Sequence, residues 1–305
     1  MTSTRQPHAA AVARPATAPL DAKDLAALAL LALLAFVLHR DVLRQWWTHE
    51  DGLVLLFALG RSPLELLFRP AAWQELSTAG FFPLLPISFR LDYALAGLSP
   101  RFAYAHQLAS ALGAAALLYL YVRGFAGRVV SLLAAGAMIA APLMSLIVRQ
   151  GMVRNYIEGL FLTAAALLLW RRSTLAGATG AAALWVAAAL CKEAWILAPL
   201  LMVADSIARR EAVRRIALRA APLVALGTIY LAWRSWMLGS SGGYRTFPPL
   251  SDLAEAPGVF WGNMTLRTPE PWSGIWGLAL LILGAAAVVR LRGRAAVVLL
   301  LAAAA

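Results

Sequence analysis

Two adjacent carboxylates, Glu50 and Asp51, follow the first long hydrophobic run of the chain, within Thr48-His49-Glu50-Asp51-Gly52. Adjacent carboxylates repel each other, and an apolar neighbourhood removes water from them, so at least one of the two holds a proton more tightly. A carboxylate tuned in this way can act as a general base on a hydroxyl group while its neighbour positions it. The sequence therefore predicts Glu50 and Asp51 as a catalytic pair, with a slight preference for Asp51 as the base.

The same residues allow two other interpretations. The spacing Thr48-x-x-Asp51 fits a capping box, in which Asp51 serves only to stabilise the start of a helix. His49 and His106 could bind a divalent metal together with nearby acids, but they lack the helical pairing that is typical of metal ligands. The sequence therefore specifies no cofactor, and a divalent metal stays a weakly supported option.

The composition determines which elements must position these residues. The chain is 61% hydrophobic and 14% charged, with a mean hydropathy of +0.72. Its apolar stretches are continuous in Ala, Leu and Val, unlike the alternating strands of outer-membrane barrels. We therefore expect an all-α, polytopic membrane helical bundle. About nine spans are expected, at residues 25–38, 102–122, 129–148, 156–170, 174–190, 195–204, 220–236, 275–289 and 295–305.

The segments between these runs suggest a simple domain organisation. Residues 1–23 are rich in Ala, Pro and Thr and predict a disordered tail, whereas residues 24–305 form one membrane domain. Residues 40–101 are expected to form a large first outer loop and residues 237–273 a second one. Amphipathic helices that lie on the membrane surface are expected to begin in the first loop at Asp51 and at Ser62-Pro63. The last apolar run has no polar flank, so the chain is expected to be truncated.

The charge distribution predicts the orientation. If the N-terminus is cytoplasmic, the inner loops hold 15 basic and 4 acidic residues, against 12 and 11 elsewhere. This asymmetry follows the positive-inside rule and places the acidic pair on the extracytoplasmic face of a plasma (inner) membrane. The net charge of +12 is then explained by topology. Membrane lipids are expected as partners, and nucleic acid is not.

Three further motifs follow the acidic pair in order: the segment 81–98, which begins Phe81-Phe82-Pro83; Tyr104-Ala105-His106-Gln107-Leu108; and Leu190-Cys191-Lys192-Glu193-Ala194-Trp195. Together they resemble the GT-C membrane glycosyltransferases, in particular bacterial enzymes of the dolichyl-phosphate-mannose protein mannosyltransferase type. Arg234 and the segment 239–245 are similar to the start of a later outer loop in that family. The chain departs from the pattern at Ala141-Pro142, where many relatives have His-Pro, and in the turn 149–158.

The resemblance implies transfer of a sugar from a polyprenyl-phosphate donor to a protein, lipid or glycan acceptor on the extracytoplasmic face. The base would come from Glu50 or Asp51. The lipid phosphate that leaves needs a cation to stabilise its charge. The expected phosphate-binding residues are Arg149, Arg154, Lys192, Arg234 and Arg245, and the expected supporting residues are His49, Asp92 and Glu193.

These residues also have structural explanations. Arg149 and Arg154 could reach lipid headgroups from the end of a span. Lys192 and Glu193 could form a local ion pair, and Asp92 could pair with Arg90 or Arg101.

Other classes of protein remain open as well. A transporter or flippase would place ionisable groups near the middle of the membrane. Another lipid-processing enzyme, such as a ligase or an acyltransferase, and a non-catalytic scaffold are the remaining alternatives.

Overall fold

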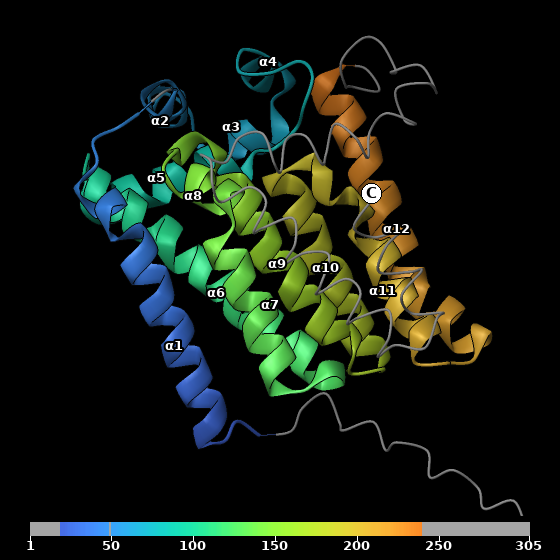
Figure 1. The fold of residues 1–305 in the computed structure, drawn as a ribbon. Coiled ribbons are helices and arrows are strands. Elements are labelled where there is room, and N and C mark those ends of the chain that lie inside the picture. The colour runs from blue at the N-terminus through green and yellow to red at the C-terminus, as the bar shows by residue number, and fades with distance from the viewer. Residues whose placement is uncertain (1–18, 49, 240–305) are drawn as a thin grey trace, which may run out of the picture.

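The computed structural model describes residues 19–48 and 50–239, and this part of the chain is helical with no strand (Figure 1). Long helices run side by side, and several of the short helices lie together at one end of the bundle. The long helices are α1 (Ala22–His39), α6 (Pro100–Ala126), α7 (Arg128–Ala140), α9 (Arg154–Trp170), α10 (Leu175–Cys191) and α12 (Val213–Leu238). The shorter elements are η1 (Arg40–Arg44), α2 (Asp51–Leu59), α3 (Pro63–Phe68), α4 (Pro70–Gln74), α5 (Leu84–Ala96), α8 (Pro142–Val148), η2 (Gly151–Val153), η3 (Glu193–Leu197) and α11 (Ala198–Ala208).

We call the end of the bundle that carries α2 to α5 the loop end. The start of α6, the turn between α8 and α9, and the end of α10 all reach it (Figure 1). Helix α9 packs against both α6 and α10, and α12 packs against α10. Helix α1 and η1 therefore lead the chain to the loop end, where the candidate residues gather.

Four described helical segments are long and apolar enough to cross a membrane: Ala22–Arg44, Pro100–Ala126, Gly151–Trp170 and Val213–Leu238. Helices α7 and α8 form a fifth if the pair is one span, bent by 54° where Ala141 is extended and Pro142 cannot continue the helical hydrogen bonds. Helix α10 has 17 residues and α11 has 11, so both are apolar but short. The expected number of about nine spans is therefore not confirmed.

Several expected segments lie outside the described residues. They are most of the tail 1–23, most of the second loop 237–273, and the last two apolar runs, 275–289 and 295–305.

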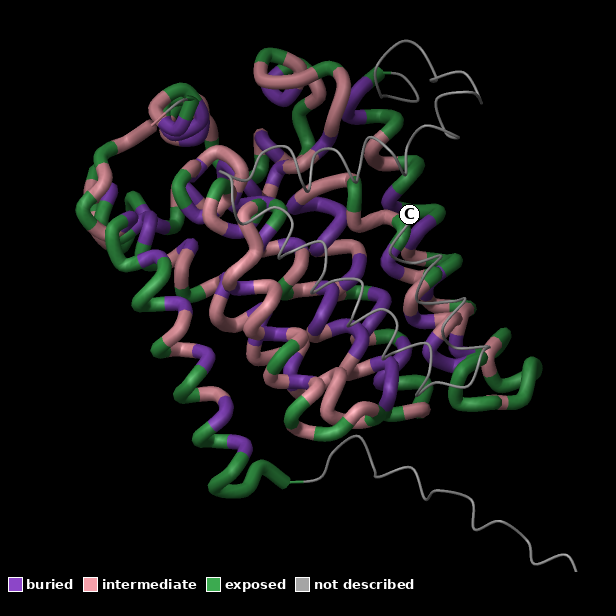
Figure 2. The backbone as a smooth tube through the Cα atoms, viewed as in Figure 1, coloured by how far each residue is buried: buried purple, intermediate pink, exposed green. Residues whose placement is uncertain are grey.

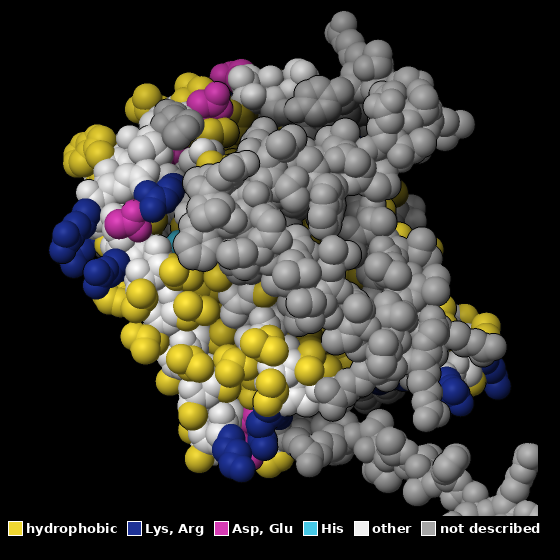
Figure 3. Space-filling view, viewed as in Figure 1, with side chains coloured by type: hydrophobic (Ala, Val, Ile, Leu, Met, Phe, Trp, Pro, Cys, Tyr) yellow, Lys and Arg dark blue, Asp and Glu magenta, His cyan; other side chains and the backbone are white. Residues whose placement is uncertain are grey.

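Small residues allow the helices to approach closely. Five alanines of α10 are completely buried against its neighbours, and Gly159 on α9 leaves room for the indole of Trp195. Large apolar side chains such as Leu30 and Leu33 are instead exposed on α1. Exposed and buried stretches alternate along this helix (Figure 2). On the part of the flank that Figure 3 leaves uncovered, hydrophobic side chains lie between charged groups at the two ends. This distribution is typical of helices that pack together in lipid.

Two short helices of the loop end, α2 and α3, begin at the residues that the sequence predicts. Helix α3 starts with a capping box between Ser62 and Glu65 and has Pro63 in its first turn. The backbone N–H and the hydroxyl of Ser62 donate to Glu65 and, with Arg69, hold the pKa of Glu65 below its usual range. Helix α2 begins at Asp51.

Candidate active site

Asp51 is completely buried at the start of α2, and both oxygens of its carboxylate accept hydrogen bonds. Oδ1 accepts from the backbone N–H of Met152, at 2.7 Å. Oδ2 accepts from the phenol of Tyr104, at 2.8 Å, and from the backbone N–H of Thr48, at 3.1 Å. A Cβ atom on Gly151 would lie 3.1 Å from this carboxylate, so glycine keeps the space open. Asp51 therefore connects α2, α6 and the turn before α9.

Glu50 has a different environment although it is the next residue in the chain. It is exposed, and its side chain caps no helix N–H. The expected capping box is present only in part: Asp51 accepts from the Thr48 N–H, but the Thr48 hydroxyl points toward the backbone carbonyl of Arg149, at 3.1 Å. The pair thus combines one fixed, buried carboxylate with one that solvent can reach.

A groove of about 520 Å³ reaches Thr48, two residues before Glu50 in the chain. Thr48 forms part of its wall and also bonds to Asp51. The amide of Gln45 donates to the Arg149 carbonyl at 2.8 Å, and the Arg149 guanidinium pairs with Asp41 at 2.5 Å. The lining residues are Asp41, Arg44, Gln45, Thr48, Leu146, Arg149 and Gln150. The charged residues of its lining are two arginines and one aspartate, so the groove carries more positive than negative charge.

A second polar cluster joins α5, α6 and α9. Arg154 is completely buried, pairs with Asp92 and stacks over the ring of Phe89 at 4.2 Å. His106 Nδ1 lies 2.7 Å from the same Asp92 carboxylate. The sequence suggested Arg90 or Arg101 as the partner of Asp92, but its arginine partner in the structure is Arg154.

Two residues near this cluster were missed by the sequence reasoning. The Ser88 hydroxyl donates to Glu158, whose carboxylate lies 4.0 Å from His106 Nε2. Arg90 instead donates to three backbone carbonyls at the end of α2, at 2.7–3.3 Å.

Lys192 and Glu193 also turn away from each other. Glu193 accepts from Arg234 at 2.6 Å and from the backbone N–H of Phe81 at 2.7 Å, so it ties the loop end to α12. The Lys192 ammonium lies over the rings of Phe82 and Tyr156, at 5.2 and 4.9 Å. The expected local ion pair between Lys192 and Glu193 is therefore wrong.

The structure brings most of the predicted residues to the loop end but divides them among these clusters. His49 and Arg245 lie outside the described residues. Among the described residues, no three His, Cys, Asp or Glu side chains come together as a group that could hold a metal ion. Tyr104, which binds Asp51, could have been found from sequence as a polar residue in the first turns of an apolar span.

The fold and the site define a helical protein of the multi-span membrane class with a carboxylate-centred site at one end. Over 198 residues the chain is 31% identical to a Drosophila melanogaster protein named protein O-mannosyl-transferase Tmtc1. The match covers 61% of this chain and 23% of that relative, so the chain spans less than a quarter of the relative's length. No protein-family model and no solved structure matches the chain. The similarity supports a glycosyltransferase at the level of class.

Proposed function

We propose that this protein transfers a sugar from a polyprenyl-phosphate donor to a hydroxyl-bearing acceptor on the extracytoplasmic face of the membrane. The observation that carries the proposal is the acidic pair at the loop end, in which a buried Asp51 holds an exposed Glu50 near a basic groove. The printed name of the relative, protein O-mannosyl-transferase, supports mannose as the sugar and protein as the acceptor. The sequence resemblance to GT-C enzymes points in the same direction.

The two acids have separate roles in this proposal. Asp51 is completely buried and accepts its hydrogen bonds from groups of the protein itself, so it cannot contact an acceptor without losing these partners. Glu50 is exposed next to it, so it can approach a bound hydroxyl group. We therefore assign Glu50 as the general base and Asp51 as the residue that positions it, which reverses the slight preference from sequence.

The reaction is a single displacement. The acceptor oxygen forms a bond to the anomeric carbon as the bond from that carbon to the phosphate oxygen breaks. The electron pair of the broken bond leaves with the polyprenyl phosphate, and the hydroxyl proton moves to Glu50. One displacement inverts the configuration at the anomeric carbon.

Lys192 is best placed to receive the charge that develops on the phosphate. The described arginine candidates already have carboxylate partners: Arg149 with Asp41, Arg154 with Asp92 and Arg234 with Glu193. Lys192 has aromatic contacts and no carboxylate partner among the described residues. One of those rings, Phe82, also packs against the buried cluster that α2 and α5 form together. An ammonium held in this way can bind a phosphate without first breaking an ion pair.

The position of buried charge supports an enzyme over a transporter. In the described chain, the buried charged residues lie near the two ends of the bundle: Asp51, Asp92 and Arg154 at the loop end, and Asp24, Arg171, Asp205 and Arg219 at the opposite end. A transporter is expected to hold ionisable groups near the middle of the membrane.

The catalytic assignment is tested with full-length protein in vesicles, supplied with radiolabelled polyprenyl-phosphate mannose and a serine-rich and threonine-rich peptide. Glu50→Gln should lower kcat by about 10²–10⁴-fold, because a general base contributes about that much. Glu75→Gln is the matched control, since Glu75 is exposed on the same segment and pairs with Arg61. Equal turnover by Glu50→Gln and Glu75→Gln would remove Glu50 from the mechanism, and no transfer by the wild type would reject the reaction.

The phosphate assignment has its own measurement. Lys192→Gln should raise the KM for the polyprenyl-phosphate donor at least tenfold, because the phosphate loses its cationic partner and about 1.4 kcal/mol of binding free energy corresponds to a factor of ten. The KM for the peptide should stay within about twofold of the wild-type value. Lys192→Arg keeps the positive charge and should recover part of the affinity. A donor KM that is unchanged in Lys192→Gln would exclude Lys192 from the phosphate site.

The membrane face is tested by cysteine labelling in intact cells, in a Cys191→Ser background. A cysteine at Leu64, an exposed position at the loop end, should react with a membrane-impermeant maleimide. A cysteine at Ala176, exposed at the opposite end of the bundle, should react only after the cells are permeabilised. The reverse pattern would place the site on the cytoplasmic face.

A further inference from the structure

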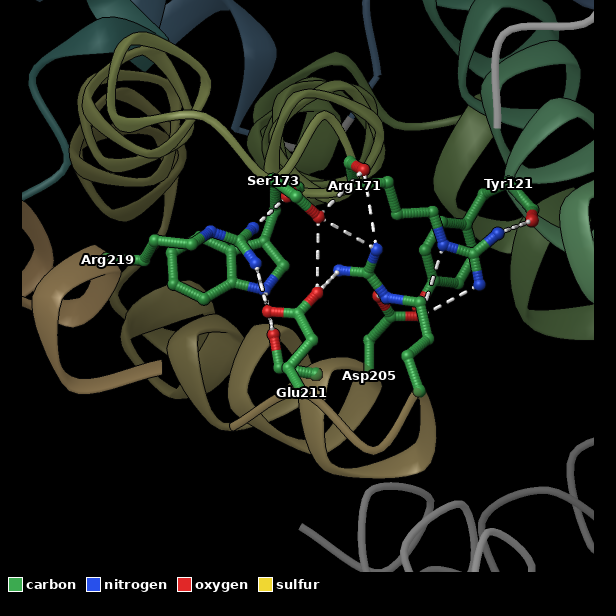
Figure 4. A network of polar contacts seen from close by, with 9 residues as sticks. Tyr121, Arg171, Ser173, Asp205, Glu211 and Arg219 are labelled. Atoms are coloured by element: carbon green, nitrogen blue, oxygen red, sulfur yellow. Dashed lines mark hydrogen bonds and ion pairs between the residues drawn. The ribbon is translucent and has the colours of Figure 1, made fainter. Parts of the chain in front are cut away.

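A network of ion pairs, most of them buried, lies at the end of the bundle opposite the loop end (Figure 4). Asp205 on α11 accepts from Arg171 at 2.7 Å and lies 3.0 Å from Arg209. Glu211 pairs with Arg209 at 2.6 Å and with Arg219, and accepts from the Ser173 hydroxyl at 3.2 Å. These contacts fasten the turn between α9 and α10 to the turn between α11 and α12.

Two carboxylates neutralise only part of the positive charge of this region. Four further arginines are exposed and have no carboxylate partner among the described residues: Arg172 and Arg210 on the two turns, and Arg214 and Arg215 at the start of α12. We call these four residues the arginine platform. Because the buried network fixes both turns, the platform is held in one place without using its own charges.

Exposed apolar side chains accompany the arginine platform. Val213 is 82% exposed, and Ile207 and Leu218 are 57% and 62% exposed. The turn between α11 and α12 projects from the bundle, and basic and hydrophobic side chains lie next to each other there (Figures 1 and 3). A surface that combines both kinds of side chain matches the boundary between lipid headgroups and acyl chains.

The start of α12 gives an independent reason to look for an external partner. Arg214 and Arg215 stand in the first turn of α12, which contains no acidic residue and no side-chain cap. The positive end of the helix dipole disfavours arginines at this position. The stability of the helix therefore does not explain these two residues, whereas a negatively charged partner does.

We propose that the arginine platform is a binding surface for the headgroups of anionic phospholipids. The guanidinium groups contact the phosphates of several lipids, and Val213 and its apolar neighbours enter the acyl region. The apolar side chains favour a lipid over a soluble anion, because a soluble anion would leave them in water. This surface is separate from the sugar-transfer site, which lies at the other end of the bundle.

The test measures thermal unfolding of the full-length protein in detergent during titration with dioctanoyl phosphatidylglycerol or dioctanoyl phosphatidylcholine. Phosphatidylglycerol should raise the Tm of the wild type more than phosphatidylcholine does. In Arg214→Gln/Arg215→Gln, the concentration for half of this rise should increase by about an order of magnitude or more, since each arginine near an anionic surface contributes about fivefold in affinity. Arg40→Gln/Arg101→Gln removes two exposed charges at the loop end and should behave as the wild type.

Three results would overturn the proposal. The first is an unchanged phosphatidylglycerol response in Arg214→Gln/Arg215→Gln, and the second is an equal loss in the Arg40→Gln/Arg101→Gln control. The third is an equal rise in Tm with glycerol phosphate, which carries the headgroup charge without acyl chains. A Val213→Ser variant separates the apolar part, because it should weaken the response to phosphatidylglycerol while all four arginines remain.

Discussion

At the residue scale, the hydrogen bonds around Asp51 explain how an acidic residue can be buried at the edge of a membrane domain. The donors to this carboxylate come from three residues: Thr48 before α2, Tyr104 on α6 and Met152 in η2. Thr48 and Met152 donate through backbone N–H groups, so these two hydrogen bonds do not depend on their side chains. The carboxylate is therefore a cross-link of the fold as well as a neighbour of the proposed base.

Tyr104→Phe should lower the free energy of unfolding by about 1.5–3 kcal/mol, because it removes a hydrogen bond to a buried charged group. The Tm in detergent measures this loss, and sugar transfer should fall with it because Glu50 is less well positioned. Tyr93→Phe is the control, since Tyr93 is exposed on α5. Equal Tm values for the two variants would show that the Tyr104 phenol does not stabilise Asp51.

At the element scale, close approach between α9 and the turn that carries Lys192 depends on one glycine. A Cβ atom on Gly159 would lie 2.2 Å from the indole of Trp195, which belongs to η3. The Trp195 carbonyl in turn accepts from the Trp185 indole of α10, at 3.1 Å. The position of η3, and with it the position of Lys192, therefore depends on this contact.

Gly159→Ala should lower the free energy of unfolding by about 1–3 kcal/mol, because the added methyl group overpacks the contact with Trp195. It should also raise the donor KM, since η3 must move. Gly52→Ala adds the same methyl group in α2, where no atom lies within 4 Å, and alanine favours a helix over glycine by up to about 1 kcal/mol. Thermal unfolding should show opposite signs for the two variants, and a destabilised Gly52→Ala protein would contradict this explanation.

At the scale of the whole molecule, the buried charges of the described chain are arranged in two layers that differ in structure. At the loop end, buried charges surround a groove and an exposed acid. At the opposite end, they form a closed network that holds two turns together (Figure 4). The helices between them bury alanine and glycine against one another and expose leucine, so the two ends are held at a fixed distance by apolar packing.

Asp205→Asn should destabilise the protein by about 3–5 kcal/mol, because it leaves the buried Arg171 without its anionic partner. Asp41→Asn breaks the exposed pair with Arg149 and should cost only about 0–1 kcal/mol. Thermal unfolding of both variants measures the difference. A similar Tm for the two would mean that the network of Asp205 does not hold the opposite end together.

The sequence by itself determined where the helices form. Continuous apolar runs predict α6, α9, α10 and α12, and Ser62, Pro63 and Glu65 predict the start of α3. These features depend on residues within a few positions of one another, so local patterns are sufficient. The order of the acidic pair and the later motifs was likewise enough to suggest a class of enzyme.

Only the tertiary structure decided the partners of the charged residues. Asp92 pairs with Arg154, 62 positions away, and Glu193 with Arg234, 41 positions away, although each has a basic residue within two positions in the sequence. It also decided which acid of the pair is buried, because the donors to Asp51 come from α6 and η2. Helix packing brings these distant groups together, and burial then makes each charge depend on the partner that the packing provides.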